Sequence, residues 1–215
     1  MTTAKTTLAL GALLVAATVS LAAQSLDHRH QIELRLGLWN QLNDVRTEAS
    51  AGGVSTSVGT TGFLGGVAYG HWLSEAVALR VSAGAMAARV TADVSGSGVF
   101  TETAAVSQLL LGMRYYFPRS TYGSAVRPFL GAGIGAIIGS QVASEVGTVV
   151  TAEARTEPAI GGEVGGGVDF LLSRHVAISA GLAFALMTDF GEPIGGSDNY
   201  SGPQLTLGFS YVLGG

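Results

Sequence analysis

Six ionisable side chains stand out in this chain because each occurs at an alternate position of an otherwise apolar segment. Alternation at 180° per residue places such side chains on one face of a β-strand, opposite the apolar face. Three are acids and three are arginines, and unpaired charges in a confined interior are costly. We therefore expect a hydrogen-bonded ionic network, assisted by Gln108, Gln204 and Tyr116. Its charged members are Glu33, Arg35, Arg80, Arg114, Glu163 and Asp169.

Two further patterns suggest ligand chemistry. Residues 131–136 match a G-x-G-x-x-A dinucleotide fingerprint, and Glu153 follows about 20 residues later. That fingerprint is meaningful only between a strand and a helix, whereas period-two alternation continues through these glycines, so we interpret them as strand residues. The carboxylates of residues 189–199 could bind Ca²⁺, but they lack the fixed spacing of a calcium loop, which favours a solvated loop. We expect no cofactor and no metal site.

The composition limits the class of protein. The chain has 215 residues, of which only 12% are charged, with 32 glycines and no cysteine. Soluble domains carry about 25% charged residues, yet no apolar stretch of the mature part has the roughly 20 residues of a spanning helix. A closed β-barrel is the other way to satisfy backbone polar groups in lipid. The net charge of −4 gives no electrostatic basis for binding nucleic acid.

The first 23 residues have the features of a secretory signal. Lys5 supplies positive charge, residues 8–19 form a short apolar stretch, and Ser20 and Ala22 place small side chains at a cleavage site. The stretch is too short, and too rich in Ala and Thr, for a membrane anchor. We therefore expect residues 1–23 to be a cleaved signal peptide and residues 24–215 to form one outer-membrane β-barrel domain.

Eight segments of the mature chain alternate between apolar residues and small or polar ones, as β-strands with two different faces do. In the first segment, Ile32, Leu34 and Leu36 alternate with Glu33 and Arg35. Apolar side chains on one face, with glycines and ions on the other, predict lipid outside and a polar interior. The segments are residues 30–40, 61–72, 77–90, 104–117, 127–139, 159–171, 175–187 and 203–213.

The connections between these segments alternate in length. Residues 41–60, 91–103, 140–158 and 188–202 are polar and rich in Ser, Thr and Gly, whereas the intervening links are shorter. Long outer loops and short periplasmic turns predict an all-β, eight-stranded antiparallel up-and-down transmembrane barrel. Aromatic residues near strand ends would form a girdle at the membrane interfaces. They are Tyr69, Trp72, Tyr115, Phe117, Phe129, Phe170 and Tyr211.

A soluble, lipocalin-like barrel is the main rival fold, since alternation alone does not say which face is outside. It would need an apolar cavity, whereas one face here is packed with Leu, Ile, Val and Phe and the other is dominated by Gly, which favours the membrane barrel. An enzymatic barrel would need a general base at its outer rim. His28 and His30 precede the alternation of the first strand, and His71 and His175 fall at periplasmic ends, so we expect no catalytic residue.

With this pattern the chain resembles the family of small eight-stranded outer-membrane β-barrels, of the OmpA-transmembrane-domain and OmpX type. The resemblance covers essentially the whole mature chain and is most evident in residues 69–80, 109–117 and 127–135. The chain departs from the family by ending on Leu213-Gly214-Gly215 in place of a terminal Phe. The last strand also looks like the family's assembly signal, carried here by Thr206, Gly208, Tyr211 and Leu213.

The resemblance implies a location and partners more than an activity. It implies an integral protein of a Gram-negative outer membrane, in contact with lipid and lipopolysaccharide and inserted by periplasmic chaperones and the barrel-assembly machinery. We expect a non-enzymatic protein that supports envelope integrity or binds a surface ligand through its outer loops, with an interior closed by the ionic network. The alternative is a narrow, porin-like channel for small or hydrophobic solutes.

Overall fold

The structure, a computed structural model, describes residues 29–42, 61–95, 98–118, 125–146 and 150–213. The expected signal peptide therefore lies outside the described residues. No helix in the described ranges is long and apolar enough to cross a membrane. Eight strands follow one another in chain order: β1 (His30–Asn40), β2 (Thr61–Trp72), β3 (Val77–Ser95), β4 (Gly98–Tyr116), β5 (Val126–Val146), β6 (Val150–Leu171), β7 (Val176–Met187) and β8 (Gly202–Leu213).

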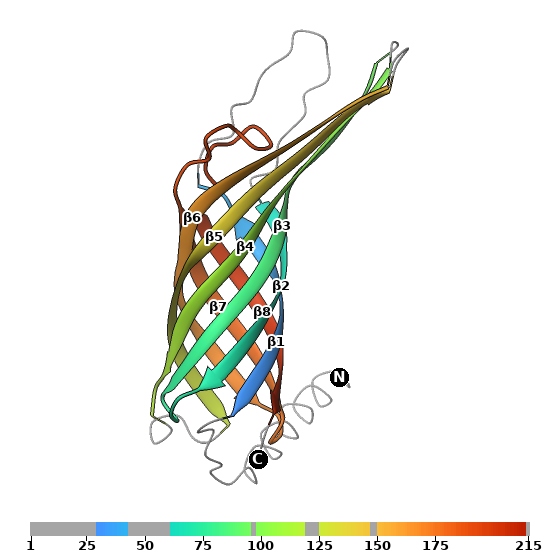
Figure 1. The fold of residues 1–215 in the computed structure, drawn as a ribbon. Coiled ribbons are helices and arrows are strands. Elements are labelled where there is room, and N and C mark those ends of the chain that lie inside the picture. Colours follow the sequence, from blue (N-terminus) through green and yellow to red (C-terminus); the bar gives the residue numbers. More distant parts are fainter. Residues whose placement is uncertain (1–28, 43–60, 96–97, 119–124, 147–149, 214–215) are drawn as a thin grey trace, which may run out of the picture.

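The strands form a closed barrel in which each strand pairs with its sequence neighbours, and β1 pairs with β8 (Figure 1). All of these pairings are antiparallel. His30 is opposite both His71 of β2 and Leu213 of β8, so β1 begins and β8 ends at the same end of the barrel. The expected all-β, eight-stranded, up-and-down fold is confirmed.

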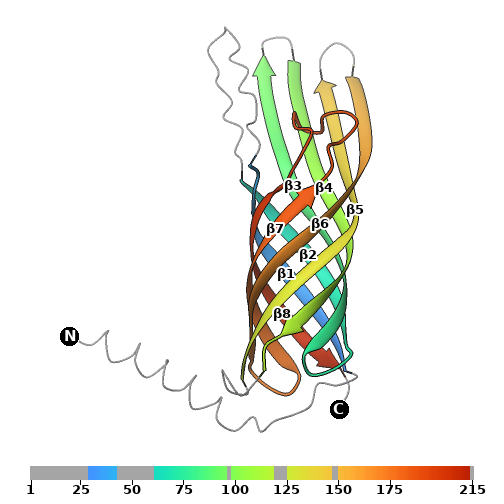
Figure 2. The same ribbon diagram turned by 90° about the vertical axis from the view of Figure 1, so that its left-hand side faces the viewer.

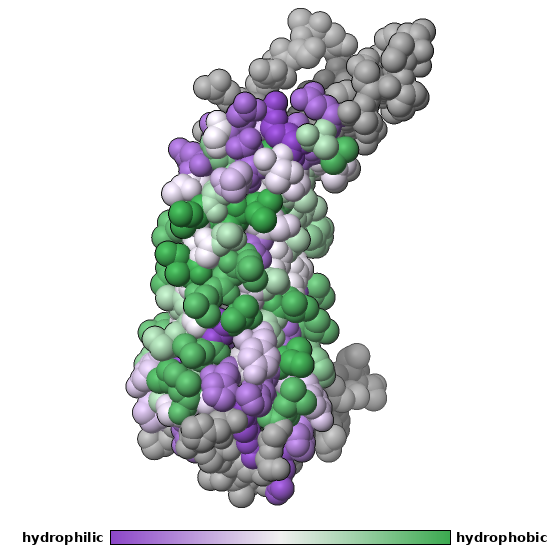
Figure 3. Space-filling model, viewed as in Figure 1, coloured by the Kyte–Doolittle hydropathy of each residue, from purple (hydrophilic) through white to green (hydrophobic). Residues whose placement is uncertain are grey.

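The two faces of the barrel wall differ sharply in chemistry. In β1 the side chain of Glu33 is buried in the interior, whereas its neighbours Ile32 and Leu34 are exposed on the outer face and Leu36 is 71% exposed. Figure 3 shows a broad hydrophobic belt across the visible face of the barrel, with hydrophilic residues gathered toward both ends, and large apolar side chains are exposed on the outer face of every strand from β1 to β8. Soluble proteins rarely expose an apolar surface of this extent. The outer face is therefore the one that meets lipid, which excludes the lipocalin-like alternative.

Four strands are longer than the sequence predicted. β3 continues to Ser95, β4 begins at Gly98, β5 continues to Val146 and β6 begins at Val150. The assignment of residues 91–103 and 140–158 to outer loops was therefore wrong over most of their length. Beyond the apolar belt, lipid no longer requires apolar side chains on the outer face, so the apolar–polar contrast that marks a membrane-spanning strand weakens. The segments contain Thr and Val, which favour strands, but their Ser- and Gly-rich composition resembles that of a loop.

These extensions form a four-stranded structure, which we call the outer sheet and define as residues 87–95, 98–105, 139–146 and 150–160. Pairing with β2 stops at Met86 and pairing with β7 stops at Gly161, so within the described ranges both edges of the outer sheet lack a partner strand. The outer sheet projects beyond the other strands, at the end of the barrel opposite His30 and Leu213 (Figures 1 and 2). A register shift between Ala87 and Arg89 marks a β-bulge where β3 leaves the ring.

Candidate functional site

The barrel interior is filled by three layers of side chains, which we call the aromatic, ionic and outer apolar layers. The aromatic layer lies nearest to His30 and Leu213 and consists of Trp72, Ala78, Tyr116, Phe129 and Val212. The Trp72 and Tyr116 rings lie 4.3 Å apart, centroid to centroid. The Arg127 guanidinium lies 4.4 Å from the Trp72 ring, in a cation–π contact. Large side chains therefore fill this end of the barrel.

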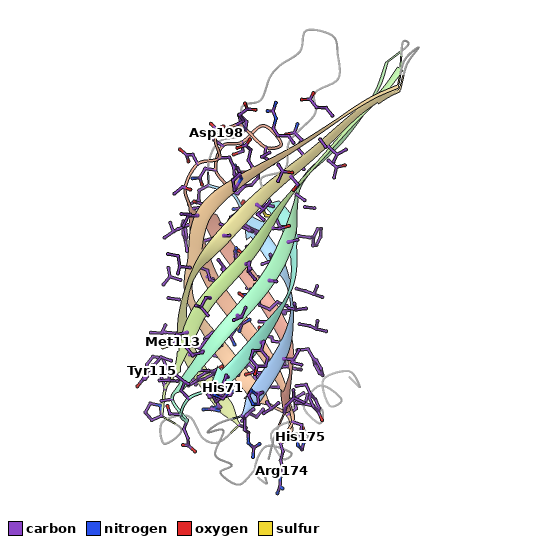
Figure 4. All side chains as sticks on the ribbon, viewed as in Figure 1. His71, Met113, Tyr115, Arg174, His175 and Asp198 are labelled. Atoms are coloured by element: carbon purple, nitrogen blue, oxygen red, sulfur yellow. The ribbon has the colours of Figure 1, made fainter. Side chains whose placement is uncertain are left out.

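Two members of the aromatic layer correct the prediction of the interfacial girdle. Trp72 and Phe129 were expected at the lipid interface, but they are 2% and 7% exposed and point into the barrel. Trp72 shares the parity of Leu64 and Ala68, which also point inward, so strand alternation decides its direction. The remaining predicted girdle residues are exposed on the outer face: Tyr69, Tyr115, Phe117, Phe170 and Tyr211. Figure 4 shows Tyr115 projecting from the outside of the wall.

Glu33 is the centre of the ionic layer. Its two carboxylate oxygens accept hydrogen bonds from Nη1 and Nη2 of Arg80 at 2.8 and 3.0 Å. The same oxygens accept bonds from Nη1 and Nη2 of Arg114 at 3.1 and 3.4 Å. The Glu33 side chain is only 3% exposed. One buried carboxylate therefore holds two guanidinium groups, each through the paired geometry that makes arginine–carboxylate contacts strong.

The other charged residues extend this layer. Arg114 Nη1 lies 3.9 Å from Asp169 Oδ1, and the Tyr116 hydroxyl donates to Asp169 Oδ2 at 2.9 Å. Arg35 Nη1 donates to the Glu163 carboxylate at 3.4 and 3.5 Å. The structure thus brings the six residues singled out in the sequence into one layer, as a group of four and a looser pair. Tyr116 joins this layer through its hydrogen bond to Asp169.

The two glutamines expected to assist the network do not do so. Gln108 and Gln204 are buried, but Gln108 Nε2 and both amide atoms of Gln204 have no hydrogen-bond partner among the described residues. Gln204 is opposite Trp39 in the strand register, which places it nearer the outer mouth than the ionic layer. Buried amides of this kind are commonly satisfied by ordered water.

Sequence reasoning overlooked Arg127, although it is only 2% exposed. Its Nη2 donates to the backbone oxygen of Glu75 at 2.6 Å, and its guanidinium also lies 4.9 Å from the Tyr116 ring. The residue thus links the aromatic layer to the turn between β2 and β3. Its parity in β5 is that of the inward glycines Gly131 and Gly133, and this signal could have identified it.

The outer apolar layer includes part of the final loop, residues 188–201. Phe190, Ile194 and Tyr200 of this loop are buried against side chains of the barrel wall, namely Trp39, Leu64, Met86, Ala104, Val106, Ile137 and Ala185. The Tyr200 hydroxyl donates to the backbone oxygen of Ile194, and the Gly195 amide donates to Gln141 Oε1 of β5 at 2.9 Å. The solvated loop predicted for residues 189–199 is therefore wrong for Phe190 and Ile194, which cover the barrel mouth together with Tyr200.

Two acids of the final loop, Asp189 and Glu192, have protein partners. Asp189 Oδ1 accepts a bond from Asn199 Nδ2 at 2.7 Å, and Glu192 pairs with Arg155 of β6 at 2.9 Å. In the part of the chain that the structure describes, no group of three or more His, Cys, Asp or Glu residues could hold a metal ion. The Gly131–Ala136 segment of the dinucleotide pattern lies within β5, with no helix after it.

The described histidines and the predicted assembly signal lie apart from the outer mouth. His30, His71 and His175 lie at the end of the barrel where Leu213 ends β8 (Figure 4), and His28 is outside the described residues. In β8 the Tyr211 ring stacks on His175 at 5.9 Å. Thr206 Oγ1 donates to the backbone oxygen of Gly181 at 3.4 Å. A side chain at Gly208 would collide with Ser179 and meet Glu33, so this glycine leaves space for the ionic layer.

A closed antiparallel barrel with an apolar outer belt and a filled, charged interior is a transmembrane β-barrel of the bacterial outer-membrane class. The family model for the outer membrane protein beta-barrel domain matches residues 10–212. The chain belongs to this family, which places it among outer-membrane proteins. Among curated protein sequences, none matches the chain.

The solved structure of Ail shows the same fold at low sequence identity. Ail, the attachment invasion locus protein of Yersinia pestis, is 12% identical, with a TM-score of 0.52 over 87% of this chain and 99% of that one. That structure contains the heparin analogue sucrose octasulfate. OprG from Pseudomonas aeruginosa is 14% identical, with a TM-score of 0.46 over 91% of this chain and 100% of that one. These likenesses concern the fold alone.

Proposed function

We propose that this protein is a non-enzymatic surface platform of the outer membrane. Its barrel is closed to solutes and holds the outer sheet above the membrane for contact with a partner. The observation that carries this proposal is the combination of a projecting four-stranded sheet with an interior filled in three layers. A rigid scaffold that presents exposed segments is the usual arrangement for recognition. The alternative, a narrow channel, would require all three layers to open together.

The charge of the chain indicates which kind of surface partner it favours. Ail was solved with a sulfated ligand, so one barrel of this fold has a ligand bound in its structure. The present chain carries a net charge of −4, and the described ionic side chains of its outer sheet include Glu153 and Glu157 beside Arg155. An acidic chain has little electrostatic attraction for a polysulfate. The proposed partner is therefore a neutral or cationic surface.

The proposed orientation can be tested with single cysteines, because the natural chain contains none. Glu153→Cys places a thiol on the outer sheet, where the Glu153 side chain is 80% exposed. Glu75→Cys places one in the exposed turn between β2 and β3. A membrane-impermeant maleimide should label Glu153→Cys on intact cells and Glu75→Cys only after the outer membrane is permeabilised. The reverse pattern would show that the outer sheet faces the periplasm.

The closed interior predicts electrical silence in planar lipid bilayers. The folded chain from residue 24 should give no discrete single-channel current. The double variant Phe190→Ala/Ile194→Ala removes two of the buried side chains of the final loop at the mouth, yet it should also remain silent, because the ionic and aromatic layers persist beneath it. Heat-modifiable migration on a gel would verify folding.

A matched control for this experiment is Glu192→Gln, which changes an exposed side chain of the same loop. Regular openings in the double variant alone would mean that the final loop is the lid of a channel. Openings in the unaltered protein would replace the platform proposal with the narrow channel.

A further inference from the structure

One edge of the outer sheet, formed by residues 150–160 of β6, lies open among the described residues, because β7 pairs with β6 only as far as Gly161. Ile160 shows which backbone groups face this edge. Its N–H donates to Thr188 Oγ1 at 3.2 Å, and its C=O accepts a bond from the Thr188 amide at 2.9 Å, on the side of β7. Alternate residues of an antiparallel strand direct both groups to the same side. Since the β5–β6 register has no shift, the residues that turn these groups toward the open edge are 154, 156 and 158.

Of these three positions, the open edge is blocked at one and available at two. Pro158 has no N–H, and proline is one of the devices that protect the edges of natural sheets. Ala154 and Thr156 lie farther from the barrel, are exposed and keep both backbone groups (Figure 1). An additional strand can therefore form hydrogen bonds with the outer part of β6, but not beside Pro158.

The charges beside these positions indicate which strand fits there. Glu153 and Arg155 flank Ala154 on one face of β6, and their side chains are 80% and 40% exposed. When two copies of this segment pair antiparallel, with Ala154 opposite Ala154, Glu153 of each copy lies opposite Arg155 of the other. Such a pair has Cα atoms about 4.5 Å apart and side chains on the same face, where opposite charges are stabilising. The segment is therefore complementary to itself.

Pro158 selects this register over the nearest alternative. A pairing centred on Thr156 would also place opposite charges across the junction, with Arg155 against Glu157. Ala154 would then lie opposite Pro158, which cannot donate a hydrogen bond to the Ala154 carbonyl, and the symmetry of the pair would repeat this loss. A pairing centred on Ala154 keeps both hydrogen bonds between the two Ala154 residues. The charges and the proline thus agree on one register.

We propose that two copies of this chain associate through the β6 edges of their outer sheets, antiparallel and centred on Ala154. Identical strands paired in this way are related by a two-fold axis, the commonest symmetry of dimers. Each copy has a net charge of −4. Charges are screened beyond about 8 Å at physiological ionic strength, so the local ion pairs decide the contact. The inference rests on the proposed function in using the projecting outer sheet, and it adds a specific partner, a second copy.

Single cysteines test the register, because the natural chain has none. When the folded protein is oxidised in detergent micelles, Ala154→Cys should give a disulfide-linked dimer on a non-reducing gel. The two Cα atoms would lie about 5.5 Å apart, within the range of a disulfide. Thr156→Cys is the matched control: its position is also exposed, but the same residue of the second copy lies about 13 Å further along the strand. It should stay monomeric. Equal cross-linking of both variants would overturn the register, and no dimer of Ala154→Cys would overturn the association.

Charge reversal tests the ion pairs without a covalent link. Glu153→Arg and Arg155→Glu each place like charges opposite one another, and each should raise the dissociation constant of the dimer at least tenfold, as measured by sedimentation in detergent. The double variant Glu153→Arg/Arg155→Glu exchanges the charges and should restore the association. Glu192→Gln removes the partner of Arg155 within the chain at 2.9 Å, so it is the control and should dimerise as the unaltered protein does. A double variant that stays as weak as the single ones would refute the proposed pairing.

The possible outcomes separate self-association from the surface-platform proposal. A protein that sediments as a monomer at every concentration would overturn self-association, whereas labelling of Glu153→Cys on intact cells would still support an outer sheet at the cell surface. The reverse labelling pattern would overturn the platform and leave a dimer measured in detergent unaffected.

Discussion

Replacing Glu33 by Gln should destabilise the barrel by about 3–5 kcal/mol, the cost of removing one partner from a buried ion pair. The carboxylate lies between Arg80 and Arg114 and accepts four hydrogen bonds from them. Without its charge, both guanidinium groups remain buried with much weaker compensation. The free energy of unfolding can be measured by urea titration in lipid vesicles, with the fluorescence of the buried Trp39 and Trp72 as the signal.

The matched control is Glu153→Gln, which removes a glutamate from an exposed ion pair with Arg155 at 3.9 Å. Exposed pairs contribute little, so this variant should unfold at the same urea concentration as the unaltered protein. A loss below about 1 kcal/mol for Glu33→Gln would show that Arg80 and Arg114 are well solvated or paired elsewhere, and that Glu33 does not organise the ionic layer.

Replacing Trp72 by Ala should have an effect of similar size, about 3–5 kcal/mol, because it removes a large buried ring and leaves a cavity. The ring packs against Tyr116 at 4.3 Å and lies under the Arg127 guanidinium at 4.4 Å. Both contacts are lost in the variant. Urea titration measures the stability, and near-ultraviolet circular dichroism should show that the aromatic layer has lost its fixed packing.

Phe170→Ala is the control for this prediction, since it removes an aromatic ring from the outer face, where the ring is 44% exposed. Lipid can fill the space that this ring leaves, so the loss of stability should be clearly smaller than for Trp72→Ala. Equal losses for the two variants would mean that Trp72 contributes as an interfacial residue and not as part of a packed interior.

Strand alternation made most of this fold predictable. Six strand starts, those of β1, β2, β3, β5, β7 and β8, agree with the predicted positions to within one residue. The direction of each side chain follows from parity, because lipid and interior impose opposite chemistry on the two faces. The prediction failed beyond the apolar belt, where the contrast between the two faces ends: β3, β4, β5 and β6 are longer there than predicted. The outer sheet is rich in Ser and Thr, and its composition therefore resembled that of a loop.

The sequence singles out the charged residues of the ionic layer by their position in the strands, but it does not specify how they pair. Glu33 on β1 reaches Arg80 on β3 past the intervening β2. This is possible because the inward residues of β2 at that level are Ala68 and Gly70, which are too small to separate them. Such a contact depends on the relative register of three strands, which alternation within one strand does not specify. The burial of Phe190, Ile194 and Tyr200 depends on how the final loop folds back, and no periodic pattern encodes it.

The pairing of β1 with β8 has a consequence for the order of folding events. His30 and Leu213 are direct partners although almost the whole chain lies between them, so this seam is the least local contact in the barrel. Contacts of long sequence separation form slowly. Until the seam closes, β1 and β8 both present unpaired backbone groups, to which other chains could add as strands. The last strand to be synthesised thus completes the barrel, and every truncated chain that lacks it retains two open edges.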